Sequence, residues 1–212
     1  MFGKLTVPDT KERYPVVIYV QTAEGATVDM KRPNGRGGTF NYYDLYREKL
    51  TGMNVGFFSY EGRGVRMGDA PPRYEQIDWD IYNTSTLESK VRDILGAVSI
   101  VQKQKGVDPS RIYLMGASEG TMLAAEAAFE AIVHRYLSPL QSYCRRWLDS
   151  HLADEVVQHT LMKAYLCVRD DDRPLVLRPW LYRVAHNAAL NAVEKKGSDW
   201  EELDENYDGV PQ

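Results

Sequence analysis

A pentapeptide at residues 116–120, Gly-Ala-Ser-Glu-Gly, constrains the fold of this chain more than any other feature of its sequence. It directly follows the apolar run 112–115 and precedes a helix-like stretch, residues 121–128. Glycine on both sides of a serine permits a sharp turn that lifts the hydroxyl clear of a sheet, and the amide after the serine can donate to an oxyanion. The pattern predicts a strand, a tight turn and a helix in succession, with Ser118 as a candidate nucleophile.

Two more runs of β-branched and aromatic residues, 15–20 and 54–60, have the composition of buried parallel strands. Between the second run and the serine turn, residues 85–103 carry apolar side chains at helical spacing. Strand, helix and strand in succession predict a parallel sheet with right-handed crossovers. The third strand is then left as an apolar edge, which favours self-association of the chain unless another element covers it.

Two short segments around this pattern carry a family resemblance: residues 60–64, Tyr-Glu-Gly-Arg-Gly, and residues 107–112, Val-Asp-Pro-Ser-Arg-Ile. Residues 60–64 resemble the Asp-x-Arg-Gly segment of the α/β-hydrolases, and residues 107–112 resemble that family's lead into the serine turn. Over about residues 5–128 the chain resembles the N-terminal half of this fold, of the esterase and dipeptidyl-peptidase-like kind. The resemblance implies a truncated hydrolase-like sheet, with Ser118 at the nucleophile position.

By the same resemblance, the oxyanion donors would be the backbone amides of Glu119 and of Thr22 or Ala23. In that family the acid and the histidine follow the serine turn at the ends of later strands, which are missing here. The chain's histidines all fall in helical patterns instead; they are His134, His151, His159 and His186. A serine without a positioned base is a weak nucleophile. An inactive hydrolase-like half is therefore favoured, with a serine esterase or peptidase capped by the helices as the alternative.

Beyond residue 128 the pattern changes to that of a small all-α bundle. Apolar positions repeat at helical spacing over residues 129–140, from near Leu152 to about 165, and from Pro179 to about 196. Proline is favourable at a first helical position. Residues 197–212 are acidic with little apolar periodicity, which predicts a disordered tail. The predicted fold is thus a truncated α/β sheet over residues 1–128, a helical domain over 129–196 and the tail.

The helical domain carries another resemblance, in residues 129–146, in Ala-Asp-Glu-Val-Val-Gln at 153–158 and in Pro-Trp-Leu-Tyr-Arg-Val-Ala-His-Asn-Ala-Ala-Leu at 179–190. These segments resemble region 2 of the sigma factors, particularly the extracytoplasmic-function group. The resemblance implies two partners, core RNA polymerase through the clamp helices of its β′ subunit and the -10 element of promoter DNA. No cofactor is implied.

The residue types fit those roles. The acceptors Asp154, Glu155 and Gln158 lie within about one helical turn and suit a basic partner helix of the polymerase. Arg183 and Asn187 are four residues apart on the side opposite the packing face, where one can neutralise a phosphate and the other can bond a base edge. Trp180 is interpreted as a core residue.

Two arginines, Arg173 and Arg178, belong to the 169–178 loop, where the family captures a base flipped out of the non-template strand. Three aspartates in the same loop weaken that interpretation. His151, Glu155 and His159 recur at intervals of four, but eight residues span more than two turns, so no metal site is predicted.

The net charge of -4 hides an uneven distribution, because residues 199–208 are rich in acid and residues 129–196 are slightly basic. The chain has two cysteines, and its first residues lack the apolar stretch of a secretory signal, which predicts a cytoplasmic protein. No run of apolar residues approaches the length needed to span a bilayer.

The helical domain departs from the sigma family in two respects. The acidic pair is Asp-Glu where the sigma family has Glu-Asp, and no helix-turn-helix for a -35 element follows. A sigma-type module fused to a hydrolase-like half is favoured over a serine hydrolase, and a recombined or artificial chimera is the third hypothesis.

Overall fold

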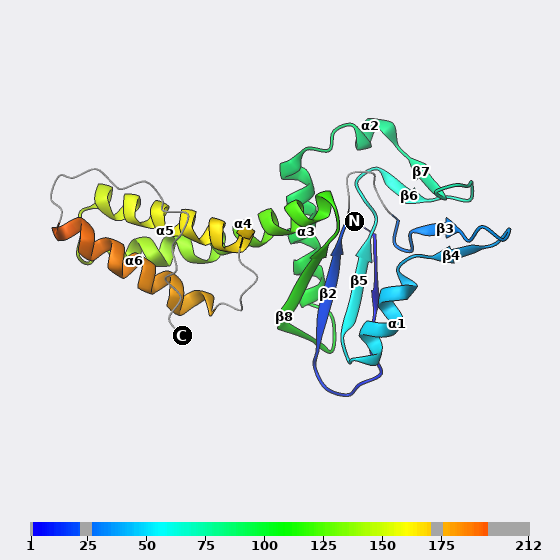
Figure 1. The fold of residues 1–212 in the computed structure, drawn as a ribbon, viewed down its shortest axis with the longest axis horizontal. Helices are drawn as coiled ribbons and strands as arrows, with labels where there is room; N and C mark the ends of the chain where they lie inside the picture. The colour runs from blue at the N-terminus through cyan, green and yellow to red at the C-terminus, as the bar shows by residue number, and fades with distance from the viewer. Residues whose placement is uncertain (1, 22–26, 171–175, 195–212) are drawn as a thin grey trace. The chain divides into compact units, whose positions relative to one another are not determined.

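The computed structural model describes residues 2–21, 27–170 and 176–194 (Figure 1). The chain forms two compact units, Met1–Ala131 and Ile132–Gln212, here called unit 1 and unit 2. The division falls inside one helix, α4 (Glu119–Cys144), three residues beyond the predicted boundary at 128. The predicted disordered tail, residues 197–212, lies outside the described residues.

A four-stranded sheet forms the centre of unit 1, in the order β1-β5-β2-β8 (Figure 1). The three predicted strands are β2 (Tyr14–Val20), β5 (Gly56–Tyr60) and β8 (Val107–Gly116), and they are parallel to one another. The fourth, β1 (Gly3–Thr6), pairs antiparallel with β5. The α/β fold class is therefore confirmed, but the sheet is mixed where the sequence predicted a parallel one. In this sheet β8 is an edge strand, and self-association through it stays a prediction.

Helices cover both faces of this sheet, which explains why its central strands are apolar without alternation. On one face, α3 (Leu87–Gln102) packs on the sheet together with Leu123 and Ala127 of α4. On the other, α1 (Asp44–Gly52) packs through an aromatic cluster of Tyr19, Tyr43 and Phe57. Successive residues of a strand therefore pack into the cores on opposite faces of the sheet: Phe57 packs with the α1 cluster and Phe58 with the α3 cluster.

The predicted helix at residues 85–103 is α3, and local chemistry fixes its start. The Thr86 hydroxyl accepts from the Ser89 amide at 3.1 Å, and the Ser89 hydroxyl accepts from the Thr86 amide at 2.9 Å. This reciprocal capping satisfies two amides at the beginning of the helix. The remaining elements of unit 1 are short; they are β3 (Lys31–Pro33), β4 (Thr39–Asn41), β6 (Val65–Met67), β7 (Glu75–Ile77) and α2 (Trp79–Tyr82).

A buried arginine ties α1 to the sheet. Arg47 is only 6% exposed, and its guanidinium contacts Asp29 at 2.7 Å and Asp44 at 2.8 Å. The same group donates to the carbonyl oxygen of Val28 at 2.6 Å and to the hydroxyl of Ser59 at 3.2 Å. A buried charge needs this degree of pairing to be tolerated.

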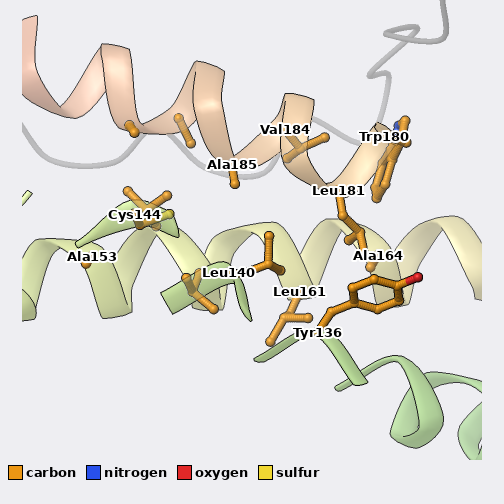
Figure 2. Close-up of a cluster of buried hydrophobic side chains, with 14 of the residues drawn as sticks. Tyr136, Leu140, Cys144, Ala153, Leu161, Ala164, Trp180, Leu181, Val184 and Ala185 are labelled. Atoms are coloured by element: carbon orange, nitrogen blue, oxygen red, sulfur yellow. The ribbon is translucent and has the colours of Figure 1, made fainter. Parts of the chain in front are cut away.

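The described part of unit 2 contains three helices: the C-terminal part of α4, α5 (Ser150–Asp170) and α6 (Leu177–Glu194). Asp149 caps α5, because its carboxylate accepts from the Leu152 amide at 2.9 Å. The structure starts α6 two residues before the predicted Pro179, whose missing N–H costs nothing in a first turn. Figure 2 shows the shared core, in which the labelled residues include Leu140, Ala164 and Leu181.

The two cysteines lie in helices of unit 2: Cys144 is buried and Cys167 is half-buried. Across the described ranges, none of the helices combines the length and the apolar character that a membrane crossing requires.

Candidate serine turn and nucleic-acid interface

Ser118 adopts the backbone conformation that the pentapeptide predicts. Its φ is +53°, in the left-handed region that residues with a side chain rarely adopt, and it lies exposed between β8 and α4. The two glycines are required by close packing. A Cβ on Gly116 would overlap the carbonyl oxygen of Gly120, and a Cβ on Gly120 would overlap the carbonyl oxygen of Val20. The turn therefore has the strained strand-to-helix geometry of a nucleophile elbow.

Hydrogen bonds around Ser118 begin helix α4 directly after the serine. The hydroxyl and the amide of Thr121 both donate to the Ser118 carbonyl oxygen, the amide at 3.0 Å. One oxygen of the Glu119 carboxylate contacts the ammonium of Lys90 at 3.1 Å. Two of the predicted oxyanion donors, Thr22 and Ala23, lie outside the described residues. The structure therefore places the serine and Glu119 but leaves the other donor as a prediction.

No imidazole is available to Ser118 from its own unit. The first histidine in the sequence is His134, and unit 1 ends at Ala131. A hydroxyl needs an adjacent base to become an effective nucleophile. Near the start of α4, a cavity of about 50 Å³ is lined by residues that include Lys90, Leu123 and Tyr60, a volume suited to one or two water molecules. Unit 1 thus combines a serine turn of strained geometry with a sequence that contains no histidine.

The exposed side of α6 carries the residues predicted to contact DNA. Arg183 and Asn187 are exposed, whereas Trp180, Leu181 and Val184 are buried in the unit 2 core (Figure 2). The interpretation of Trp180 as a core residue is confirmed, since its side chain is 8% exposed. Arg178 is exposed in the first turn of α6, and Arg173 lies outside the described residues.

The described part of the chain offers no carboxylate within ion-pair distance of Arg178 or Arg183. Arg146, which is exposed in the turn after α4, also has no carboxylate of the described residues within ion-pair distance. Unpaired guanidinium groups can contact phosphate without first breaking an internal salt bridge. Three cations of unit 2 are therefore available for a polyanion.

The acidic residues of α5 are partly engaged inside the unit. Asp154 accepts from the Gln141 side chain at 3.0 Å and contacts the Arg145 guanidinium at 3.1 Å, which links α5 to α4. Glu155 lies 3.1 Å from the Nδ1 of His151. Gln158 is exposed. Docking on a basic helix would compete with the contacts of Asp154, whereas Gln158 is open to a partner.

A cluster of aromatic side chains beside α6 was not predicted from the sequence. Trp147, in the turn between α4 and α5, lies 4.8 Å from His186 of α6, ring centre to ring centre, with the two planes at 80°. Tyr143 contacts the same histidine, with 3.1 Å between its hydroxyl and the Nδ1 of His186. Trp147 and Tyr143 lie 39 and 43 residues before His186 in the sequence, so no local pattern reveals these contacts. Only the helical periodicity of 179–190 indicates that His186 shares a side of α6 with Arg183.

No metal centre is found: in the described ranges, no three His, Cys, Asp or Glu side chains gather where they could hold an ion. His151 and Glu155 lie one turn apart on α5, with 3.1 Å between the His151 Nδ1 and a Glu155 carboxylate oxygen. Burial, and secondarily the charge of Lys163, lowers the pKa of His159 below its usual value.

Comparison with known proteins finds sequence matches to sigma factors, including one to residues of the second unit. Residues 132–198 match the family model of sigma-70 region 2. The extracytoplasmic-function (ECF) RNA polymerase sigma factor SigM of Bacillus subtilis is 43% identical over 47 residues, which cover 22% of this chain and 28% of SigM. The ECF sigma factor SigW of the same organism is 31% identical over 74 residues, which cover 34% of this chain and 40% of SigW. The chain thus matches less than half the length of these relatives.

The solved structures similar to this chain include glucuronoyl esterases. The enzyme from Solibacter usitatus superposes with a TM-score of 0.39 at 13% identity, covering 60% of this chain and 40% of the esterase. The esterase from Caldicellulosiruptor kristjansonii gives the same TM-score and identity and covers 34% of that chain. A likeness of this size carries no argument about activity, so the description of unit 1 rests on its own geometry.

Proposed function

We propose that unit 2 is a sigma-factor-type module that binds core RNA polymerase and the -10 element of promoter DNA. The observation that carries this proposal is the exposed face of α6. It presents Arg183 and Asn187 to solvent above a well-packed core, within the segment that matches sigma-70 region 2. Arginine neutralises phosphate, and the asparagine amide can bond an adenine edge bidentately.

Titration of a single-stranded -10-like oligonucleotide with the full chain tests the DNA part, with fluorescence anisotropy measured at several salt concentrations. Arg183→Ala should weaken binding at every sequence and reduce the slope of log affinity against log salt by about 0.7, the value for one phosphate contact on a single strand. Asn187→Ala should instead relax the preference for one base. Asn191→Ala is the matched control, because it removes an exposed amide one turn further along α6. Equal affinity of all four proteins would contradict the proposed face.

A pull-down of core polymerase by the full chain tests the other partner. Glu155→Gln and Gln158→Ala should reduce retention if α5 meets a basic helix of the polymerase, because the first removes a negative charge and the second removes an amide acceptor from neighbouring positions of α5. Met162→Ala alters an exposed side chain of the same helix and serves as control. Asp154→Asn is a poorer probe, since it also weakens the contact with Arg145. Retention of every variant at the wild-type level would exclude this surface.

The second candidate function is serine hydrolysis at Ser118, and the positive φ of that residue is the observation that favours it. Labelling by a fluorophosphonate would support the enzyme if it disappears in Ser118→Ala and persists in Ser138→Ala, which changes an exposed serine elsewhere. We expect no labelling above background, because unit 1 contains no histidine to activate the hydroxyl.

A further inference from the structure

Trp147 differs from the other tryptophan of unit 2 that the structure describes. Trp180 is 8% exposed in the core, whereas Trp147 is 47% exposed. An exposed indole on a turn is ordinarily free to change rotamer. Here, two neighbouring rings contact it: His186 at 4.8 Å and Tyr143 at 5.6 Å between ring centres. Rigid aromatic surface left open to solvent is typical of recognition sites, because little side-chain entropy is lost on binding.

The supports of Trp147 are themselves fixed. Tyr143 makes a hydrogen-bond contact with His186 and an edge-on ring contact with Tyr182, at 5.2 Å between centres and 83° between planes. These contacts join the end of α4 to the first half of α6. We call the four residues Tyr143, Trp147, Tyr182 and His186 the aromatic platform.

The platform adjoins the face of α6 that carries the predicted DNA contacts. At 3.6 residues per turn, His186 lies about 60° around the helix axis from Arg183, with Asn187 about 40° to the other side. Arg146 immediately precedes Trp147 and is exposed. The contact with His186 therefore places the open indole next to α6, the helix that carries exposed Arg183 and Asn187, while exposed Arg146 is its neighbour in the chain.

We propose that Trp147 is a stacking platform for one unpaired base of a single DNA strand. This inference rests on the proposed function and extends it to a turn outside the predicted contacts. Aromatic side chains flanked by arginines bind single strands by stacking on the base while the cations follow the phosphates. Charge favours DNA over a protein surface here, since Arg146 and Arg183 have no carboxylate partner among the described residues. Tyr143 and His186 act as positioning residues for the indole.

Anisotropy titration of the full chain with a single-stranded -10-like oligonucleotide tests the platform. Trp147→Ala should lower the affinity by about 5- to 150-fold, the range of one stacked base, whereas Trp147→Phe should retain most of it. Trp79→Ala is the matched control, because it removes another exposed indole, in α2 of unit 1, and should change nothing. Circular dichroism shows whether each variant is folded.

An abasic scan of the oligonucleotide identifies the stacked base. Removal of that base should weaken the wild type as much as Trp147→Ala does, and the two changes together should weaken binding no further. The stacking proposal would be wrong if the effect of Trp147→Ala added to that of base removal at every position of the oligonucleotide. It would also be wrong if Trp147→Ala left the affinity unchanged. Loss of polymerase retention with normal DNA binding would instead make Trp147 a protein contact and exclude the stacking role. If the wild type binds polymerase but no DNA, the platform and the DNA part of the proposed function fail together.

Discussion

Gly120 lies against the carbonyl oxygen of Val20, with no room between them for a Cβ. The contact joins the helix after the serine turn to the end of the central strand β2. It makes the second glycine of the turn a packing requirement, separate from any chemistry of Ser118.

Gly120→Ala should therefore destabilise unit 1 by about 1–3 kcal/mol, because the strand carbonyl cannot move aside without disturbing the sheet. Gly96→Ala is the matched control in α3, where a Cβ meets nothing within 4 Å. That change should stabilise the unit by about 0.5–1 kcal/mol, since alanine is the better helix former. Urea unfolding followed by circular dichroism measures both, and equal stability of the two variants would contradict the packing argument.

Removal of the buried guanidinium of Arg47 should lower the stability of unit 1 more than Gly120→Ala does. Arg47→Ala leaves the Asp29 carboxylate without its closest partner and the Val28 carbonyl without a donor, for an expected loss of about 3–5 kcal/mol. Lys49→Ala, two residues away and exposed on the same helix, should change the free energy of unfolding by less than about 0.5 kcal/mol. Thermal denaturation compares the two; a mild effect of Arg47→Ala would mean that the network is dispensable.

Acid should weaken unit 1 through Asp29. Burial alone would raise the pKa of this carboxyl, but hydrogen bonds from Lys4 and Arg47 outweigh it and hold the pKa below its usual value. A depressed carboxyl pKa contributes stability above the unfolded-state pKa, and that stability is lost as the pH falls through the folded-state value. Asp29→Asn should therefore be less stable than the wild type at pH 6, with the difference narrowing towards pH 2. A constant difference in urea midpoints would show that the effect is not electrostatic.

The core of unit 2 should be sensitive to truncation at Leu181. Leu181→Ala removes a side chain that is 0% exposed and should cost about 2–5 kcal/mol. Leu190 lies on the same helix but is 44% exposed, so Leu190→Ala should cost well under half as much. Hydrogen exchange of α6 amides reports on unit 2 directly, even if unit 1 unfolds separately. Similar protection in the two variants would be inconsistent with the packing of Figure 2.

Mild acid should weaken unit 2 through His159. Burial, with a smaller contribution from Lys163, lowers the pKa of this histidine, so the unfolded state binds a proton more readily than the folded state. Stability should then decline as the pH falls below about 6.5, the unfolded-state value, towards the lower folded-state pKa. His159→Gln should flatten this decline. Hydrogen exchange of α5 at pH 7.5 and pH 5.5 checks it, and an equally steep decline in the variant would assign the effect to other groups.

The elements with strong patterns were predictable from the sequence. Runs of β-branched residues predicted β2, β5 and β8, and the spacing of apolar residues predicted α3. The strand β1 was missed because four residues are too short for a pattern, and its pairing with β5 depends on contacts about 50 residues away. The start of α6 was wrong by two residues because proline fits any position of a first turn.

The site was predictable only where its residues are close in sequence. The serine turn could be found because its glycines and Ser118 are neighbours, and Arg183 and Asn187 because helical spacing places them on one side. The contact of Trp147 with His186 spans 39 residues and depends on how α4 meets α6. The periodicity of apolar residues predicts whether a residue is exposed or buried. It does not predict which exposed residues of different helices contact one another.

The distribution of histidine along this chain separates two kinds of chemistry. Every imidazole and both thiols lie beyond residue 131, in unit 2. Histidine is the side chain whose charge ordinarily changes between pH 5 and 8. A change of acidity within that range would therefore act first on the helical unit. The sheet unit has no imidazole, but it carries exposed thioethers that oxidants can reach, at Met53 (72% exposed) and Met122 (71% exposed). Mild acid and oxidants thus have different first targets along this chain.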